Sequence, residues 1–247
     1  MFGRAAKPPI SDDDRFWVDD GLVRLSQLLG RRRMLEARVM RPTAEDFPDR
    51  FDGSEAALQL MFLRVAGCMS VDPDLVELQV FSDSTESTLE SIPFAARRSS
   101  SPGGVYAESP GHKKLVAVHQ RQLRDPLSLI AVLAHELGHV ILLGGGLVDR
   151  EAEDMEPLND LLTVFLGFGI FNANAAFQFS QYTSTDSQGW STQRLGYLPE
   201  RVWGYALARF AIERGENDPE WSKFLATNIR SYFKSSIKWL SASTRAG

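Results

Sequence analysis

The sequence predicts an α+β fold in which a small, mainly antiparallel sheet precedes a mostly helical C-terminal part. Apolar and polar residues alternate in several segments between residues 75 and 120, the period of half-buried strands. From residue 126 onward, apolar residues recur mostly at helical spacing. Strands and helices segregated in this way are typical of the α+β class. No linker divides the chain, so we expect a single domain (1–247) with a loose N-terminal arm, an N-terminal part, two central helices and a helical C-terminal part (1–10, 11–124, 125–171 and 172–247).

The N-terminal part is expected to begin with a helix. An apolar stripe over residues 11–33 follows the sequence SDDD, which can cap a helix. The next segment, MLEARVM (34–40), alternates like a short strand. Ser54 is a candidate N-cap for a second helix, which should end near Cys68.

Three strands are expected to form the sheet. The first covers residues 75–81, and the Ser-, Thr-, Pro- and Gly-rich stretch after it (82–102) is expected to be mostly loop. The segments GVYAES (104–109) and KKLVAVHQ (113–120) flank the turn PGH and therefore predict a hairpin.

The remainder of the chain is expected to be helical, with an irregular segment in the middle. The predicted helices are 126–143, 154–171, 198–214, 219–228 and 229–241. Within the irregular segment, FQFSQYT (177–183) alternates and is a candidate edge strand. The tail SASTRAG (241–247) is expected to be disordered.

Composition and charge exclude several classes of partner and location. A formal net charge of −5 favours neither nucleic acid nor an anionic membrane as the main partner. The single cysteine, Cys68, cannot form an internal disulfide, and the N-terminus lacks the apolar region of a signal peptide. The longest apolar run, residues 161–171, is too short to span a bilayer. We therefore expect a cytoplasmic protein.

One predicted helix is almost entirely apolar but carries three ionisable residues. In LSLIAVLAHELGHVILLGGG (127–146), every residue from 129 to 143 is apolar or glycine except His135, Glu136 and His139. The helix has a clear start, because Asp125 can cap it and Pro126 suits the first helical position. A helix apolar on nearly all sides must be buried, so these three side chains are expected in the interior.

A bound metal ion makes this burial tolerable. Burying an unpaired polar group costs roughly 2–7 kcal/mol, and a charge costs more. His135 and His139 are four residues apart, so both imidazoles can point to one Zn²⁺ ion, and Glu136 can reach a water on that ion. The alternative is a chance match with both imidazoles bonded to backbone carbonyls. With four histidines in 247 residues, HExxH arises by chance in roughly one chain in a hundred or fewer.

Two histidines leave zinc in need of a third protein ligand. Neither His nor Cys occurs after His139, so a carboxylate is expected, and the downstream candidates are Glu151, Glu153, Asp154, Glu156 and Asp160. Glu156 and Asp160 stand one helical turn apart, directly before an apolar stretch. One of this pair can bind the metal while the other orients a ligating imidazole.

HELGH followed by EPLND resembles the gluzincin branch of the zincin metallopeptidases, whose pattern is HExxH followed by a Glu on a second helix. The resemblance covers roughly residues 126–171 and implies a zincin-like fold; the rest resembles uncharacterised bacterial proteins. It implies a zinc-dependent hydrolase of peptide bonds in peptide or protein substrates. By this resemblance His135, His139 and Glu156 are the zinc ligands, Glu136 is the general base, and Asp160 orients a ligating imidazole without binding the metal. Glu153 is the main rival of Glu156.

The resemblance also implies a side chain that stabilises the tetrahedral oxyanion. Gluzincins commonly use a Tyr or His from the C-terminal part, where this chain has no His. The candidates are Tyr182, Tyr197, Arg201 and Tyr205, of which Tyr205 is slightly preferred.

Two other functions compete with a metallopeptidase. The first is a zinc-binding module with no significant proteolysis, which acts as a sensor, immunity or interaction domain. The second is a DNA-associated zinc protease, which the acidic net charge and the lack of a basic cluster disfavour.

Overall fold

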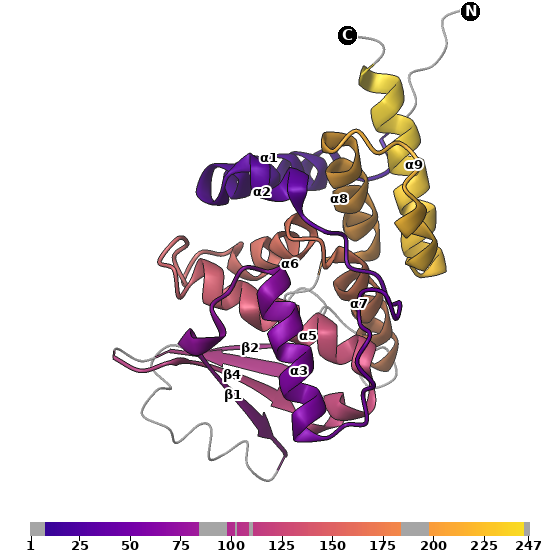
Figure 1. Cartoon of the computed structure of the whole chain (residues 1–247). Helices are drawn as coiled ribbons and strands as arrows, with labels where there is room; N and C mark the ends of the chain where they lie inside the picture. Colours follow the sequence, from indigo (N-terminus) through magenta and orange to yellow (C-terminus); the bar gives the residue numbers. More distant parts are fainter. Residues whose placement is uncertain (1–7, 84–97, 102, 109–110, 184–197, 245–247) are drawn as a thin grey trace, which may run out of the picture.

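A computed structural model describes residues 8–83, 98–101, 103–108, 111–183 and 198–244. It confirms the α+β class: a small mixed sheet lies at one end of the molecule, and α1, α8 and α9 gather at the other (Figure 1). Among the described residues, no helix combines the length and the hydrophobicity needed to cross a bilayer.

The described strands form one sheet in the order β1-β4-β3-β2. The predicted hairpin is confirmed, because β3 (Gly104–Ala107) pairs antiparallel with β4 (Lys114–His119). Strand β1 (Val76–Phe81) is also confirmed and pairs parallel with β4, so the sheet is mixed. The prediction of a loop over 82–102 is wrong at its end, where β2 (Arg98–Ser101) pairs antiparallel with β3. The segment RSSS has no apolar residue, so its sequence carries no strand pattern.

The N-terminal helices agree with the sequence except in one segment. Ser11 is the N-cap of helix α1 (Asp12–Leu29), because its Oγ accepts from the backbone N of Asp14. The predicted cap Ser54 is the N-cap of α3 (Glu55–Cys68). The predicted strand over 34–40 is wrong, because α2 (Arg31–Glu36) occupies its first half. Segment 34–40 pairs with no strand among the described residues, and local alternation alone does not make one.

The C-terminal helices differ from the prediction in their boundaries. They are α5 (Pro126–Leu142), α6 (Met155–Phe165), α7 (Gly169–Thr183), α8 (Glu200–Glu213) and α9 (Thr227–Thr244). Short 3₁₀ turns precede β1, α5 and α9, at Pro73–Leu75, Gln120–Arg124 and Glu220–Phe224. The predicted edge strand 177–183 is helical and belongs to α7. The helix expected over 219–228 is a short 3₁₀ turn, and α9 extends four residues into the tail expected to be disordered.

The predicted helix 154–171 is two helices, α6 and α7, separated at Gly167. This glycine has φ +88°, a left-handed value that favours glycine, and a Cβ there would overlap the carbonyl oxygen of Arg38. The Gly167 carbonyl accepts from the backbone N of Met40 at 2.9 Å. The segment that follows α2, residues 38–40, therefore packs directly against the backbone between α6 and α7.

Gly167→Ala is expected to destabilise the protein by about 2–4 kcal/mol, because it combines an unfavourable backbone angle with a steric overlap. Gly215→Ala is the matched control, since Gly215 ends α8 with the same backbone hydrogen-bond pattern and a similar φ of +76°, but a Cβ added there would have no atom within 4 Å. That variant should lose only about 1–2 kcal/mol. Urea unfolding midpoints of both variants test this, and equal losses would mean that the contact with Arg38 does not matter.

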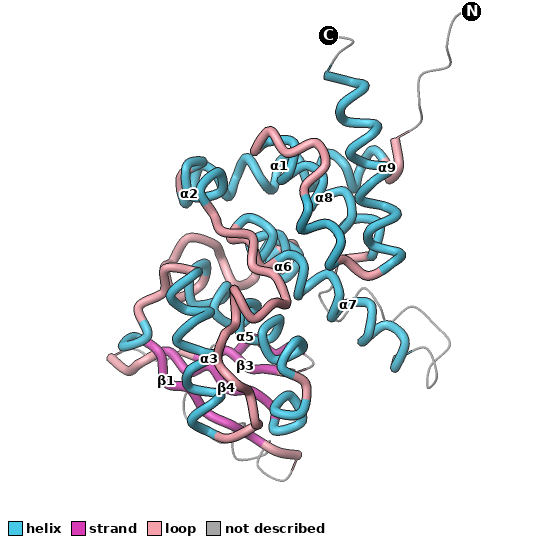
Figure 2. The backbone as a smooth tube through the Cα atoms, turned by 45° about the vertical axis from the view of Figure 1, so that its right-hand side comes forward, coloured by secondary structure: helices cyan, strands magenta, loops and turns pink. Residues whose placement is uncertain are grey.

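Helix α5 lies at the centre of the molecule. It contacts α3, α6 and α7 as well as β3 and β4, and nearly all of its residues from 128 to 142 are buried. Figure 2 shows α5 beside the sheet, with α6 next to it. The start of α5 is as predicted, because Asp125 Oδ1 accepts from the backbone N of Leu127 and Ser128. The apolar helix thus carries His135, Glu136 and His139 into the core.

Candidate metal centre

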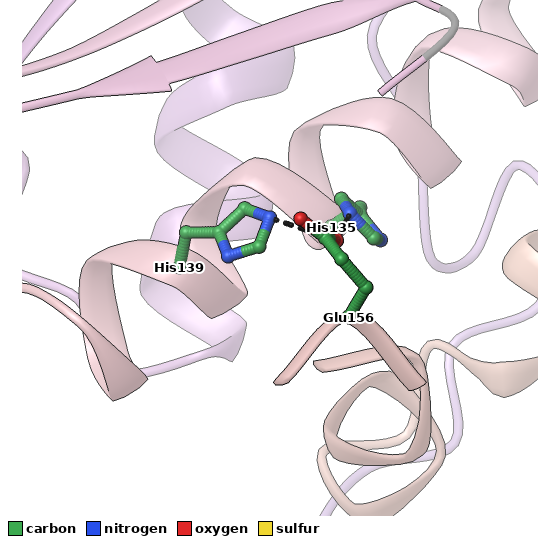
Figure 3. A group of neighbouring side chains, drawn as sticks. All are labelled: His135, His139 and Glu156. Atoms are coloured by element: carbon green, nitrogen blue, oxygen red, sulfur yellow. Dashed lines mark hydrogen bonds and ion pairs between the residues drawn. The ribbon is translucent and has the colours of Figure 1, made fainter. Parts of the chain in front are cut away.

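The two histidines of α5 and Glu156 of α6 lie together and point toward one another (Figure 3). Oε2 of Glu156 lies 3.2 Å from Nε2 of His135 and 3.4 Å from Nε2 of His139. The three ligand atoms all lie within 4.8 Å of one another. Of the carboxylates that the sequence left open, Glu156 joins the histidines, whereas the rival Glu153 is exposed.

These distances fit a tetrahedral zinc site. Ligand atoms bonded to zinc at about 2.0–2.1 Å lie roughly 3.3–3.4 Å apart along the edge of a tetrahedron. The two N···O distances agree with that edge to within about 0.2 Å, and the histidine nitrogens lie within 4.8 Å of each other. Two imidazoles and one carboxylate also leave one position of a tetrahedron for water or substrate. The residues therefore fit a divalent metal ion, although a donor set of two histidines and a carboxylate does not specify which ion.

The site is buried and its ionisable groups influence one another strongly. His135 and His139 are 4% and 0% exposed, and Glu156 is partly buried. Burial lowers the pKa of His135, but its hydrogen bonds to Asp160 and Glu156 outweigh this and raise the pKa well above the usual value. Burial raises the pKa of Glu156, yet the two histidines hold it far below its usual range. Burial lowers the pKa of His139, and the positive charges of His135 and Arg150 act in the same direction.

Asp160 holds the imidazole of His135 from the side opposite Glu156. Its Oδ1 lies 3.0 Å from Nδ1 of His135, and its Oδ2 accepts from the backbone N of Leu198 at 3.1 Å. Burial raises the pKa of this carboxyl, whereas the bond to His135 lowers it. An imidazole that donates Nδ1–H to a carboxylate keeps the lone pair of Nε2 for a metal ion, which here would lie on the side of Glu156. Asp160, one helical turn after Glu156, therefore contacts one of the two histidines from α6.

Asp160→Asn is expected to weaken zinc binding about 10- to 100-fold, the usual cost of losing such a supporting carboxylate. Titration with zinc against a chromophoric chelator measures this change. Asp154→Asn is the control, because Asp154 bonds to Arg24 at the surface of the same helix end and touches neither histidine. Equal zinc affinity of the Asp160 variant and the wild type would contradict the supporting role.

Sequence reasoning missed Asn159, which lies between the two histidines. Its Nδ2 donates to the carbonyl oxygen of His135 at 2.9 Å and lies 3.3 Å from Nε2 of His139. A Cβ at Gly138 would overlap Oδ1 of Asn159, so the glycine of HELGH provides the space for this amide. The glycine was the available signal: it indicated a close approach to the helix, but not by which residue.

Glu136, the predicted general base, is packed against the sheet. It is 0% exposed, and a Cβ at Gly104 would lie 2.6 Å from its Oε1. Glu136 directly follows His135 in α5, and its negative charge helps to raise the pKa of that imidazole. Strand β3 can pass so near to α5 only because position 104 has no side chain.

The structure contradicts the choice of Tyr205 as the oxyanion-stabilising residue. It is buried in α8, and its hydroxyl donates to Asp19 of α1 at 3.1 Å. Burial and this carboxylate raise its pKa far above the usual value. Within the described part of the chain, no hydrogen bond joins Tyr205 to the histidines or to Glu156. The alternative Arg201 pairs with Asp14 at the surface.

The two remaining candidates lie outside the described residues. These are the side chain of Tyr182 and the whole of Tyr197. Among the described side chains, the aromatic residue beside the site is instead Tyr106 of β3, which stacks on His139. Sequence patterns indicated no role for Tyr106 beyond strand packing.

Comparisons with known proteins do not extend this picture. Neither a protein-family model, nor a curated protein, nor a solved structure matches the chain. The candidate metal centre therefore rests on the geometry of His135, His139 and Glu156.

Proposed function

We propose that this protein is a zinc metallopeptidase of gluzincin type, with a zincin-like fold, that acts on peptides or proteins in the cytoplasm. The observation that carries the proposal is the convergence of His135, His139 and Glu156, with Asp160 behind His135 and Glu136 next to it in the sequence of α5. The spacing of these residues supports the proposal, because Glu136 directly follows His135 and Asp160 stands one helical turn after Glu156, as in the gluzincin pattern. A structural zinc site has four protein ligands, whereas a catalytic site has three and leaves one position open for water or substrate. The set of His135, His139 and Glu156 corresponds to the catalytic kind.

The proposed reaction divides the work among these residues. Zinc, when bound, lowers the pKa of a water ligand to about 7 and polarises the scissile carbonyl. Glu136 would accept a proton from the water that attacks the scissile carbonyl and would deliver it to the departing amine as the carbon–nitrogen bond breaks. Asp160 keeps the His135 ring in the orientation that exposes Nε2.

A zinc-binding module without significant proteolysis is the second candidate. The observation that favours it is the depth of the site: Glu136 and His139 are 0% exposed, and Glu156 is the ligand that reaches the surface. A general base must meet a water and a peptide bond, and one that stays covered performs no hydrolysis.

A peptide library decides between the two candidates. The zinc-loaded protein is incubated with a library of peptides derived from a bacterial proteome, and new termini are identified by mass spectrometry. The proposal expects cleavage that disappears on chelation, returns with zinc and is absent from the Glu136→Gln variant. A zinc-containing protein that cleaves neither this library nor intact proteins would favour the binding module.

A further inference from the structure

The two histidines of the metal centre are held in different ways. His135 has a carboxylate partner on Nδ1, namely Asp160. Nδ1 of His139 is buried and has no hydrogen-bond partner among the described residues. A ligating imidazole usually donates its second N–H to a carboxylate, a carbonyl or water, and this bond fixes the ring. Within the described part of the chain, a contact other than a hydrogen bond to Nδ1 therefore orients His139.

Tyr106 of β3 is the side chain in position to do so. It is 0% exposed, and its ring lies 5.8 Å from the His139 ring, centroid to centroid, with an interplanar angle of 28°. Positions 104 and 106 share one face of β3, so the strand that makes room for Glu136 at Gly104 brings Tyr106 to the next turn of α5. An aromatic ring stacked on an imidazole restricts its rotation about χ2 without a hydrogen bond.

Tyr106 is itself fixed by an ion pair. Its hydroxyl donates to Oε2 of Glu108 at 2.8 Å, and Oε1 of the same carboxylate accepts from Nη2 of Arg150 at 3.1 Å. Both charged side chains are only 18% exposed, so this pair is largely withdrawn from water. The Arg150 guanidinium carbon also lies 5.6 Å from the centroid of the Tyr106 ring. Arg150 belongs to the segment that joins α5 to α6, the two helices that carry the metal ligands.

We propose that Tyr106 is a positioning residue for His139, and that Glu108 and Arg150 hold Tyr106 in place. The inference rests on the metal centre of the proposed function, but it holds whether or not that centre hydrolyses peptides. One imidazole is thus oriented by a carboxylate of α6 and the other by an aromatic ring of the sheet. The ion pair also ties the segment between the two ligand helices to β3, so the spacing of the ligands depends on it.

Zinc affinity and the spectrum of the cobalt-substituted protein test this inference. Tyr106→Leu removes the ring and is expected to weaken zinc binding about 10- to 100-fold and to change the visible absorption of bound Co²⁺. Tyr106→Phe keeps the ring and should restore the wild-type cobalt spectrum, with zinc affinity within about threefold of wild type. Arg150→Met, which breaks the pair with Glu108, should fall between the two variants.

Tyr205 supplies the matched control. It is also a fully buried tyrosine whose hydroxyl donates to a carboxylate, but it lies at the contact of α1 and α8. Tyr205→Leu should lower stability and leave the cobalt spectrum and the zinc affinity unchanged. Circular dichroism identifies variants that remain folded, and if Tyr106→Leu does not fold, Arg150→Met and Tyr106→Phe decide the question through the same two measurements.

The outcomes separate this inference from the proposed function. The positioning role would be overturned if folded Tyr106→Leu had the zinc affinity and the cobalt spectrum of the wild type, even if the protein cleaves peptides. If the leucine variant does not fold, the same result in Arg150→Met would overturn it. The expected loss in a protein that cleaves no peptide would support the positioning role and count against the peptidase. A wild-type protein that binds neither zinc nor cobalt would overturn both.

Discussion

Glu156→Gln is expected to lower the zinc affinity of the protein by at least about a hundredfold. The carboxylate supplies one of three protein ligands, and its Oε2 lies 3.2 and 3.4 Å from the two histidine nitrogens. Binding free energies of about 10–16 kcal/mol for four-ligand structural zinc sites imply roughly 2.5–4 kcal/mol for each ligand. The glutamine keeps the shape of the side chain but replaces the charged ligand with a weaker neutral one. Competition with a chromophoric zinc chelator measures the affinity.

Glu153→Gln is the matched control for this experiment. Glu153 was the rival ligand in the sequence, and the structure leaves it exposed three residues before Glu156. The control should bind zinc as the wild type does. The reverse result, with normal affinity in Glu156→Gln and a large loss in Glu153→Gln, would move the third ligand to Glu153 and require a different start of α6.

Glu136→Gln is expected to lower kcat by about 10²- to 10⁴-fold, the usual contribution of a general base. Glutamine cannot accept the proton of the zinc-bound water, whereas its size suits the space against Gly104. Zinc content should therefore remain that of the wild type. Cleavage rates on a peptide identified in the library, measured beside elemental analysis of the same preparation, provide both numbers.

The cleavage rate and the zinc content of Glu136→Gln must be interpreted together. Lost turnover with retained zinc supports the general base. Lost zinc would mean that Glu136 is needed for the integrity of the metal centre, and unchanged turnover would exclude it from catalysis. Glu136→Asp, which keeps the charge but withdraws it by one methylene, should retain more activity than the glutamine variant.

The sequence predicted the candidate metal centre well because its chemistry is local. The spacing of His135 and His139 determines that both lie on one face of α5, and the apolar residues around them require burial. The choice of Glu156 over its acidic neighbours depended on a resemblance in the sequence, and the structure supports it through distances that join α5 to α6. Asp160 followed from the same helix, one turn further on.

The features that the sequence missed depend on contacts between distant segments. Tyr106 and Asn159 approach the histidines because β3 and α6 pack on α5; Tyr106 belongs to no motif, and Asn159 is one of the residues of EPLND to which the pattern assigns no role. The break at Gly167 is set by the crossing of residues 38–40, more than 120 positions earlier. The failure of Tyr205 has the same origin, because its partner Asp19 lies in the first helix. Patterns along the chain do not specify such pairings.

Both the proposed function and the positioning role of Tyr106 require that His135, His139 and Glu156 bind one divalent ion. Diffraction from crystals of the zinc-loaded protein, recorded at wavelengths on both sides of the zinc absorption edge, locates that ion. We expect one anomalous peak about 2.0–2.2 Å from Nε2 of each histidine and from Oε2 of Glu156. Zinc-loaded crystals with no peak between these atoms, or with the metal bound elsewhere, would show that the three side chains are not a metal site.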